Sequence, residues 1–283
     1  MTHLLEDVVA IALAEDLGHG GDRTSSATVA ADATARAAFV ARKAGVVAGL
    51  AAAAAVFAAV DATVRFTPRV TDGAHVEAGA TIACVSGRTR SLLAGERTAL
   101  NLLSHLSGVA TITARYVEAV AGTGCVVRDT RKTLPGLRAL QKAAVTAGGG
   151  ANHRSGLHDA LLVKDNHAVA VGGVGVATKA ALAGADGRPV QVEVDDLDEL
   201  DEALVAGARA VLLDNFGLDD LRRAVARARG EPEHVFVEAS GGIDLDTVRG
   251  VAGTGVDAVA VGALTHSPRA LDIGLDVVPG GKR

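Results

Sequence analysis

Cationic side chains cluster in the middle of the sequence, with a spacing suited to binding an anion. Residues 129–154, DTRKTLPGLRALQKAAVTAGGGANHR, contain no acidic residue after the first position and carry five Arg or Lys side chains. Arginine suits bidentate binding of carboxylates and phosphates, whereas Lys acts as a compact point charge. The formal net charge of the 283-residue chain is −5, so this stretch is a local positive field in an acidic protein. It points to a small anionic ligand.

Charged or glycine residues also end a series of short apolar runs further along the chain. The runs span residues 126–130, 160–167, 189–196, 210–216, 234–240 and 258–264. Nearly continuous apolar runs are typical of parallel strands that are buried on both faces. Their polar ends are Asp129, Arg131, Lys164, Asp165, Glu193, Asp214, Glu238, Ser240, Gly241 and Gly262. One such residue alone is more often a helix cap. Their recurrence favours the active-site face of a (β/α) barrel.

Helical patterns separate these runs, and the chain before them has a different character. Residues 196–207 and 218–230 have helical periodicity, so strand–helix units repeat and predict a parallel α/β domain. Only six strands are evident after residue 125, which predicts an incomplete barrel. The earlier part alternates short strands with Gly/Asp turns between helical stretches at 3–17, 48–60 and 91–107. We therefore expect an α/β protein with a smaller α+β domain at 1–107 and a barrel at 108–269. The tail, 270–283, could pack on the first domain.

Two carboxylates and two glycine-rich strand ends extend the expected chemistry. Glu193 and Asp214 follow successive strands and are hard oxygen ligands suited to Mg²⁺, which normally keeps waters and bridges to substrate phosphates. EASGGI (238–243) and VGALTHS (261–267) come last in the chain, where barrels commonly bind phosphate through backbone N–H groups. Together these features predict a phosphorylated, polyanionic substrate.

Composition excludes several other classes of function. An apolar fraction of 49% with 22% charged residues is ordinary for a soluble globular enzyme. Aromatic residues make up 2% of the chain and Trp is absent, so stacking platforms for nucleic acid are missing. Neither the acidic N-terminal stretch nor the Ala/Gly-rich run at 44–60 fits a secretory signal or a membrane span. Cys84 and Cys125 match no metal-ligand spacing and indicate reduced thiols, so we expect a cytoplasmic protein that binds neither nucleic acid nor membrane.

Several motifs, quoted as they stand here, resemble those of the quinolinate phosphoribosyltransferase family. In the second half these are DTRKTLPGLRALQK, GGGANHRSGLHDALLVKDNH, VEVDDLDE, VLLDNF and EASGGI. In the first part they are LAEDLGHGGDRTSS, ARKAGVVAGL and GERTALNLLSHLSGVAT. The resemblance covers nearly the whole chain, and TRKTxPGxR followed by GGGxNHR and KDNH is highly specific.

The resemblance implies a glycosyltransferase of the pentosyltransferase class, acting in de novo NAD biosynthesis. Quinolinate and phosphoribosyl pyrophosphate would give nicotinate mononucleotide, pyrophosphate and CO₂, with Mg²⁺ as cofactor. The family fold is an N-terminal open sandwich followed by an incomplete α/β barrel. The family forms at least a homodimer, in which the N-terminal domain of one subunit covers the barrel mouth of the other.

The resemblance also assigns roles residue by residue. The family's quinolinate-binding positions correspond to Arg131, His153, Arg154 and Lys164, with Arg97 lent by the neighbouring subunit. Lys132 corresponds to a lysine that faces phosphoribosyl pyrophosphate, and Glu193 and Asp214 to acids near the ribose and the metal. We take these last three as the catalytic residues. The positions that bind the 5′-phosphate correspond to Ser240, Gly241, Gly262 and His266. Arg138 and Lys142 lie on the predicted intervening helix and would serve packing or a dimer interface.

Elementary chemistry agrees with this reaction. Quinolinate carries two carboxylates on a flat ring, so a site poor in aromatic residues must hold it by charge. As pyrophosphate leaves, positive charge develops on the ribose, and a carboxylate such as Glu193 or Asp214 could stabilise it. The alkylated ring nitrogen is an electron sink that assists loss of CO₂, which leaves positioning and neutralisation to the protein.

Three alternatives remain open at this point. Lys164 at a barrel strand end also fits a Schiff-base aldolase, which borohydride would trap with a carbonyl substrate. A molybdenum-associated paralogue of similar fold is a second alternative, although the cation set Arg131, Arg154 and Lys164 favours a dicarboxylate substrate. The third is a sensor that binds a phosphorylated metabolite without turnover, and Glu193 and Asp214 speak against it.

Overall fold

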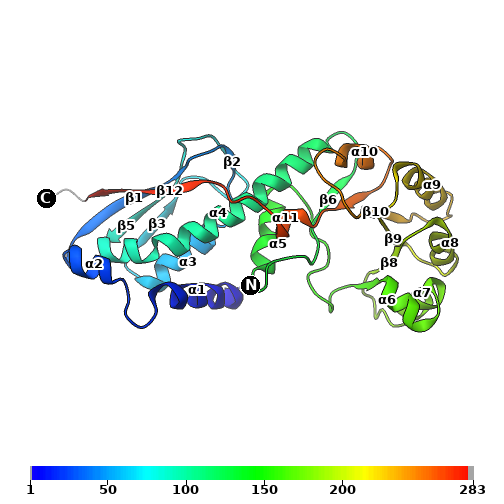
Figure 1. Ribbon diagram of the computed structural model, residues 1–283, viewed down its shortest axis with the longest axis horizontal. Coiled ribbons are helices and arrows are strands. Elements are labelled where there is room, and N and C mark those ends of the chain that lie inside the picture. Colours follow the sequence, from blue (N-terminus) through cyan, green and yellow to red (C-terminus); the bar gives the residue numbers. More distant parts are fainter. Residues whose placement is uncertain (1, 280–283) are drawn as a thin grey trace. The chain divides into compact units, whose positions relative to one another are not determined.

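The computed structural model describes residues 2–279, and the chain divides into two compact units (Figure 1). The first unit comprises Met1–Ala114, Thr133–Gly149 and Thr265–Arg283, and the second comprises Arg115–Lys132 and Gly150–Leu264. The units therefore interleave along the sequence, whereas the sequence alone suggests a single boundary near residue 107. Helix α4 (Thr89–Ala119) contributes residues to both units.

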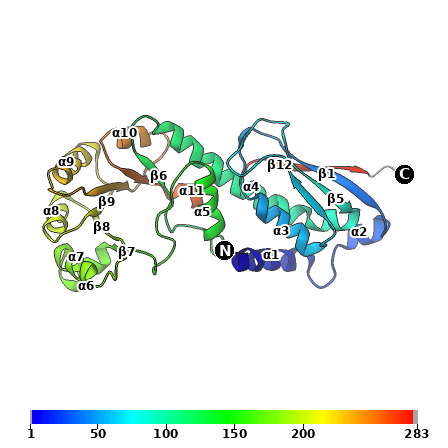
Figure 2. The same ribbon diagram turned by 180° about the vertical axis from the view of Figure 1, so that it is seen from behind.

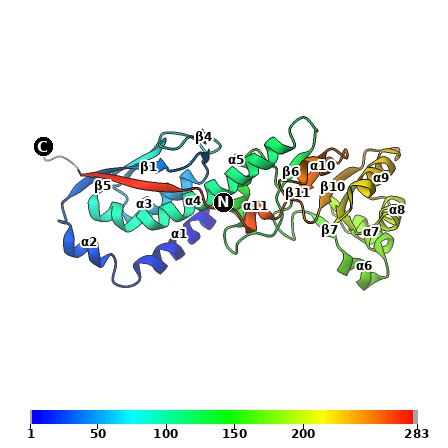
Figure 3. The same cartoon turned by 45° about the horizontal axis from the view of Figure 1, so that its top comes forward.

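The first unit is built on an antiparallel sheet with strand order β12-β1-β5-β3. The strands are β1 (Thr34–Ala41), β3 (Arg65–Pro68), β5 (Thr81–Arg88) and β12 (Ile273–Pro279), and a small pair adds β2 (Gly45–Val46) and β4 (His75–Val76). In β1 every second residue is buried, as expected for a sheet with one face on a core. β12 runs antiparallel along β1 (Figure 3), so the described part of the predicted tail joins this sheet. Residues 280–283 of that tail lie outside the described residues.

Helices complete the first unit and bury one face of its sheet. They are α1 (Thr2–Leu17), α2 (Arg23–Thr28), α3 (Leu50–Val60), the first part of α4, and α5 (Arg138–Ala147). Phe57 of α3 lies against Phe39 of β1 and Phe66 of β3, with ring centroids 6.0 and 6.2 Å away. Phe39 and Phe57 are almost fully buried, so three of the six aromatic residues of the chain form the centre of this core.

The second unit is a parallel sheet of six strands in the order β6-β11-β10-β9-β8-β7, within the described part of the chain. The strands are β6 (Val126–Arg128), β7 (Leu161–Val163), β8 (Val190–Val194), β9 (Ala210–Asp214), β10 (Phe236–Ser240) and β11 (Ala258–Ala260). The helices are α6 (Asp165–Val171), α7 (Val174–Ala183), α8 (Leu197–Val205), α9 (Leu218–Arg229) and α10 (Val248–Ala252), and the short α11 (Ala263–His266) follows β11. Helices α7 to α9 lie outside the strands (Figure 2). The predicted incomplete barrel and separate α+β unit are confirmed.

The register of these strands brings their carboxyl ends to one edge and separates their side chains into two faces. Glu193 of β8 pairs with Leu212 of β9, and Asp214 of β9 pairs with Ser240 of β10. Val192 and Leu213, which alternate with these residues, are fully buried. In β8 and β9 the outer face is thus apolar, while Glu193 and Asp214 lie on the inner face near the carboxyl ends, which explains the nearly continuous apolar runs.

Among residues 2–279, none of the helices combines the length and the apolar character that a bilayer crossing requires.

Candidate active site

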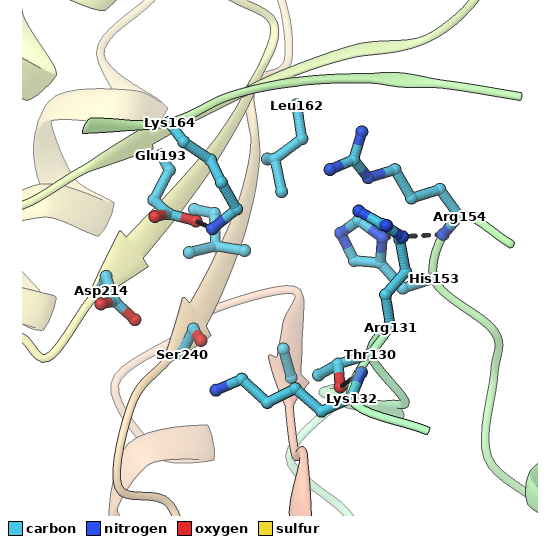
Figure 4. Close-up of a pocket in the computed structure, with 12 residues that line it drawn as sticks. Thr130, Arg131, Lys132, His153, Arg154, Leu162, Lys164, Glu193, Asp214 and Ser240 are labelled. Carbon is cyan, nitrogen blue, oxygen red and sulfur yellow. Dashed lines mark hydrogen bonds and ion pairs between the residues drawn. The ribbon is translucent and has the colours of Figure 1, made fainter. Parts of the chain in front are cut away.

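A pocket of about 200 Å³ opens at the carboxyl ends of the barrel strands (Figure 4). The residues that line it come from five strands and from the loops after β6 and before β7. They are Thr130, Arg131, Lys132, His153, Arg154, Leu162, Lys164, Glu193, Leu212, Asp214, Ser240 and Ala260. The structure therefore brings eight of the predicted site residues into one pocket of the second unit, from positions more than 100 residues apart.

Arg131 and Arg154 place two guanidinium groups on the same side of the pocket (Figure 4). Burial lowers the pKa of Arg154, and the charge of Arg131 lowers it further, while Asp159 and Glu193 act in the opposite direction. Within the described residues, the Nε atom of Arg131 is buried and has no hydrogen-bond partner. Two like charges close together, one of them with an unused buried donor, are the arrangement expected of a site prepared for an anion.

Lys164 and Glu193 face each other across the neighbouring strands β7 and β8 (Figure 4). The Nζ atom of Lys164 lies 2.5 Å from Oε2 of Glu193. Lys164 is also the N-cap residue of α6, and its backbone N–H donates to Nδ1 of His167 at 3.0 Å. His167 thus has a structural contact at the start of α6.

Asp214 is the last residue of β9, and the residue that follows it contacts the backbone at the end of β10. Its Oδ2 atom accepts a hydrogen bond from Asn215 Nδ2 at 2.8 Å, and the Asn215 N–H donates to the carbonyl of Ser240. Gly241 has φ +93°, and a Cβ atom there would stand 2.1 Å from the Asn215 Oδ1 atom. Glycine is therefore required after Ser240 both by conformation and by space.

Two carboxylates of the pocket have the chemistry of magnesium ligands. Glu193 and Asp214 project from adjacent strands into one cavity. Burial raises the pKa of the nearby Asp195, and the charge of Asp214 raises it further. The described residues contain no group of three or more His, Cys, Asp or Glu side chains that could hold a metal. Carboxylates such as Glu193 and Asp214 are oxygen ligands of the kind that Mg²⁺ accepts, alongside waters and phosphate oxygens.

The remaining predicted site residues lie outside the lining of this pocket, as far as residues 2–279 define it. Gly241 directly follows β10, and Gly262 lies two residues after the end of the neighbouring strand β11. Arg97 and His266 belong to the first unit. Arg97 is exposed on α4, and Nδ1 of His266 lies 2.6 Å from Oγ of Ser267.

Sequence reasoning missed a layer of polar residues on the same barrel face, one step further from the mouth. Gln191, two residues before Glu193, contacts Glu238, two residues before Ser240, at 2.8 Å, and Arg128 contacts the same carboxylate at 2.7 Å. The only signal for Gln191 is an amide within an otherwise apolar strand. Glu238 is visible in sequence as a strand-end acid, but its complete burial is not.

Family models match both parts of the chain. Residues 22–107 match the N-terminal domain of quinolinate phosphoribosyl transferase, and residues 109–276 match its C-terminal domain. The chain belongs to the quinolinate phosphoribosyltransferase family. The resemblance drawn from the motifs is thus confirmed, and neither the aldolase nor the molybdenum-associated alternative is favoured.

Relatives of this family align with the chain over nearly its whole length. The nicotinate-nucleotide pyrophosphorylase [carboxylating] of Mycobacterium leprae is 49% identical over 273 residues, covering 96% of each chain. The solved nicotinate-nucleotide pyrophosphorylase of Francisella tularensis has a TM-score of 0.92 at 38% identity and covers 98% of this chain and 97% of that one. NadC of Streptococcus pyogenes has a TM-score of 0.93 at 38% identity, with 99% of both chains covered. The quinolinate phosphoribosyltransferase fold therefore extends through both units.

Proposed function

We propose that this protein transfers a phosphoribosyl group from phosphoribosyl pyrophosphate to quinolinate and releases nicotinate mononucleotide, pyrophosphate and CO₂, a step of de novo NAD biosynthesis. The convergence of Arg131, Arg154 and Lys164 with two carboxylates in one pocket supports this most strongly. Such a site suits the joint binding of a dicarboxylate and of a sugar that carries several phosphates. The names of the relatives point to the same reaction.

The cations of the pocket would bind and orient quinolinate. Arg131 and Arg154 supply planar donor forks for its two carboxylates, and Lys164 adds a point charge from the opposite side. Lys164 forms an ion pair with Glu193, so an incoming carboxylate would compete with Glu193 for the ammonium. Fixing the pyridine ring in this way aims its nitrogen at the sugar carbon that is to be attacked.

The acids of the pocket would act on the ribose as pyrophosphate leaves. Glu193 and Asp214 lie on adjacent strands, where a carboxylate can stabilise positive charge developing at C1. Lys132, from the loop after β6, would neutralise the departing pyrophosphate. The bond that forms makes the ring nitrogen cationic, and this charge stabilises the electron pair that departing CO₂ leaves on the adjacent ring carbon, which then takes up a proton from water. The protein then needs no further group for decarboxylation beyond those that hold the ring in place.

The 5′-phosphate and the metal would lie at the glycine-rich strand ends and between the acids. Ser240, Gly241, Gly262 and His266 are the expected phosphate contacts, and Gly241 leaves the backbone open at this point. Glu193 and Asp214 would hold Mg²⁺, which neutralises the charge of the pyrophosphate when bound.

A homodimer would complete the site. The exposed position of Arg97 on α4 suits a residue lent to the pocket of the neighbouring subunit. We place the enzyme in the cytoplasm, where reduced Cys84 and Cys125 are expected, and both cysteines are free in the structure.

The deciding experiment mixes the purified protein with quinolinate, phosphoribosyl pyrophosphate and Mg²⁺ and follows nicotinate mononucleotide and CO₂. Nicotinate replaces quinolinate in a parallel reaction, and EDTA replaces Mg²⁺ in another. We expect turnover only with quinolinate and only with metal. Activity with nicotinate but not with quinolinate would overturn the proposed function. Binding of the substrates without turnover would instead favour a sensor that binds a phosphorylated metabolite.

A further inference from the structure

Glu238 is a completely buried carboxylate in the wall of the barrel, one layer further from the mouth than Ser240. Its Oε2 atom accepts hydrogen bonds from Arg128 Nη1 at 2.7 Å and from Gln191 Nε2 at 2.8 Å. Arg128 also lies over the ring of Phe236 and donates to the carbonyl of Asn152 at 3.3 Å. Neither Gln191 nor Glu238 belongs to the described lining of the substrate pocket, so neither is expected to touch a substrate.

These contacts fix the direction of every hydrogen bond that follows. Arg128 can only donate, so Glu238 Oε2 accepts from it, and Gln191 turns its NH₂ group toward the same oxygen. The carbonyl oxygen of Gln191 then faces His153, 2.9 Å from the Nε2 atom of the ring. A carbonyl can only accept, so this nitrogen carries a hydrogen. The other ring nitrogen, Nδ1, accepts the backbone N–H of Arg154 at 2.7 Å and therefore carries none. The network thus assigns a neutral His153 with its hydrogen on Nε2.

The loop that contains His153 and Arg154 has little regular secondary structure. The segment around His153 joins the barrel through one isolated bridge, Arg128 to Ala151. The His153 N–H donates to Asp129 Oδ1 at 2.8 Å, and Arg154 Nη1 donates to the carbonyl of Ala160 at 3.3 Å. In a loop that lacks a continuous strand ladder, such side-chain contacts determine where Arg154 stands.

We infer that Gln191 and Glu238 are positioning residues of the quinolinate site, which hold His153 in the Nε2–H tautomer and through it the backbone of Arg154. This rests on the proposed function for the identity of the ligand. His153 then acts on the substrate mainly through Arg154, since both of its ring nitrogens contact protein groups in the free enzyme.

The unfavourable burial of the Glu238 carboxylate fits a residue that fixes one side-chain arrangement and contributes little to stability. Burial raises the pKa of Glu238, while Arg128 and Gln191 act against the rise. Its second oxygen, Oε1, is buried and has no hydrogen-bond partner among the described residues. A buried acid with one unused oxygen contributes little to stability, and buried ionic groups are retained in some proteins because they specify one arrangement.

The first test reads the tautomer directly. Two-bond ¹⁵N–¹H spectra of the ligand-free protein with labelled histidine, assigned by a His153→Gln spectrum, should show a hydrogen on Nε2 and none on Nδ1 of His153 at pH 7.5. An Nδ1–H tautomer or an imidazolium in the wild-type protein would overturn the inference. This measurement needs no activity, so it decides the inference even if quinolinate proves not to be the substrate.

The second test separates hydrogen-bond direction from charge. Gln191→Leu and Glu238→Leu remove the network, whereas Glu238→Gln keeps an acceptor oxygen but removes the charge. We expect the two leucine variants to mix the tautomers and to raise the KM for quinolinate at least about tenfold, the effect of about 1.4 kcal/mol. The KM for phosphoribosyl pyrophosphate should stay unchanged, and Glu238→Gln should retain the wild-type tautomer and KM.

Thr254→Val is the matched control, because it removes a buried hydroxyl bonded to the Val251 carbonyl at 2.7 Å outside the pocket lining. It should lower stability slightly and leave both KM values unchanged. A folded Gln191→Leu with a wild-type KM for quinolinate, or equal increases of both KM values, would contradict the inference. If both leucine variants fail to fold, the wild-type tautomer and the Glu238→Gln variant still decide it.

Discussion

Arg154 carries its charge in an unfavourable place. Burial and the neighbouring Arg131 both lower its pKa, which means that the charged side chain is less stable in the folded protein than in the unfolded chain. A quinolinate dianion would relieve both effects at once. We therefore expect the Arg154 side chain to strengthen quinolinate binding but to lower the stability of the ligand-free protein, as is common at functional sites.

Replacement of Arg154 by Met tests this opposition. We expect quinolinate affinity to fall about 100-fold or more, as for loss of two charge-assisted hydrogen bonds, while the unfolding temperature of the free protein stays level or rises. Calorimetry with quinolinate and thermal unfolding provide the two measurements. Arg222→Met is the control, because Arg222 lies on the exposed face of α9 in a solvent-exposed pair with Asp219. A large loss of stability in Arg154→Met would show that the arginine is structural.

Arg131 and Lys132 lead to a simpler prediction at the same scale. Arg131→Ala removes a carboxylate fork and Lys132→Ala removes the charge expected to face pyrophosphate, so each should lower turnover by about a thousandfold or more. Circular dichroism should show an unchanged fold in both variants. Near-wild-type activity in either variant contradicts the assigned roles.

The sequence predicted the chemistry of single residues better than their surroundings. Eight predicted side chains share one pocket because strand-end position and charge are visible in the sequence. Gln191 was missed because an amide acquires its role only from the groups that it joins, here Glu238 and His153. His153 was expected to face the substrate, and only the structure shows that both of its ring nitrogens bond within the protein.

At the scale of elements, strand registers and turns place these residues. The six strands were recognised from their apolar runs, but the ends of helices were harder to read. The helical stretch expected at 91–107 continues in α4 to Ala119. Gly108, which resembles a helix end, is instead a point of close approach, where a Cβ atom would stand 2.4 Å from the carbonyl oxygen of Arg269. A single sequence cannot distinguish these two uses of glycine, because the contacting residue lies far along the chain.

The turn directly after Arg154 leads to a prediction with a defined pH dependence. The carboxylate of Asp159 accepts the backbone N–H groups of Ser155 at 2.6 Å and Gly156 at 3.0 Å. Although burial acts to raise the pKa of Asp159, these hydrogen bonds bring it from 3.8 to about 2. By analogy with helix caps, Asp159→Ala should lower the free energy of unfolding by about 0.5–2 kcal/mol at neutral pH.

The sign of the pH effect follows from the lowered pKa. The stabilisation by Asp159 is complete well above pH 3.8 and is lost as the pH falls through about 2, where the folded protein also takes up the proton. Urea unfolding at several pH values should therefore show the gap between wild type and Asp159→Ala closing over this range. Asp219→Ala, on the exposed face of α9, should show no comparable gap. A gap that stays constant down to pH 2 would exclude the charged carboxylate as its cause.

At the scale of the whole molecule, the two units contribute different parts of the proposed chemistry. The second unit holds the pocket, while Arg97 and His266 lie in the first. No local pattern in the sequence predicts that residues 133–149 return to the first unit between two parts of the second. In the structure, Gln141 of that segment bonds to His105 and to the Thr265 carbonyl, which belong to the same unit, so long-range contacts determine this arrangement.

The proposed exchange of Arg97 between subunits can be tested with two inactive variants. Arg97→Ala keeps an intact pocket but cannot complete its neighbour's site, whereas Arg131→Ala has a damaged pocket but can still lend Arg97. When the two are mixed and allowed to exchange subunits, half of the dimers are mixed, and each contains one intact site and one doubly damaged site. Activity should therefore recover to about a quarter of the wild-type value. If Arg97 instead acts within its own subunit, each subunit keeps one defect in its own site, and mixing restores no activity.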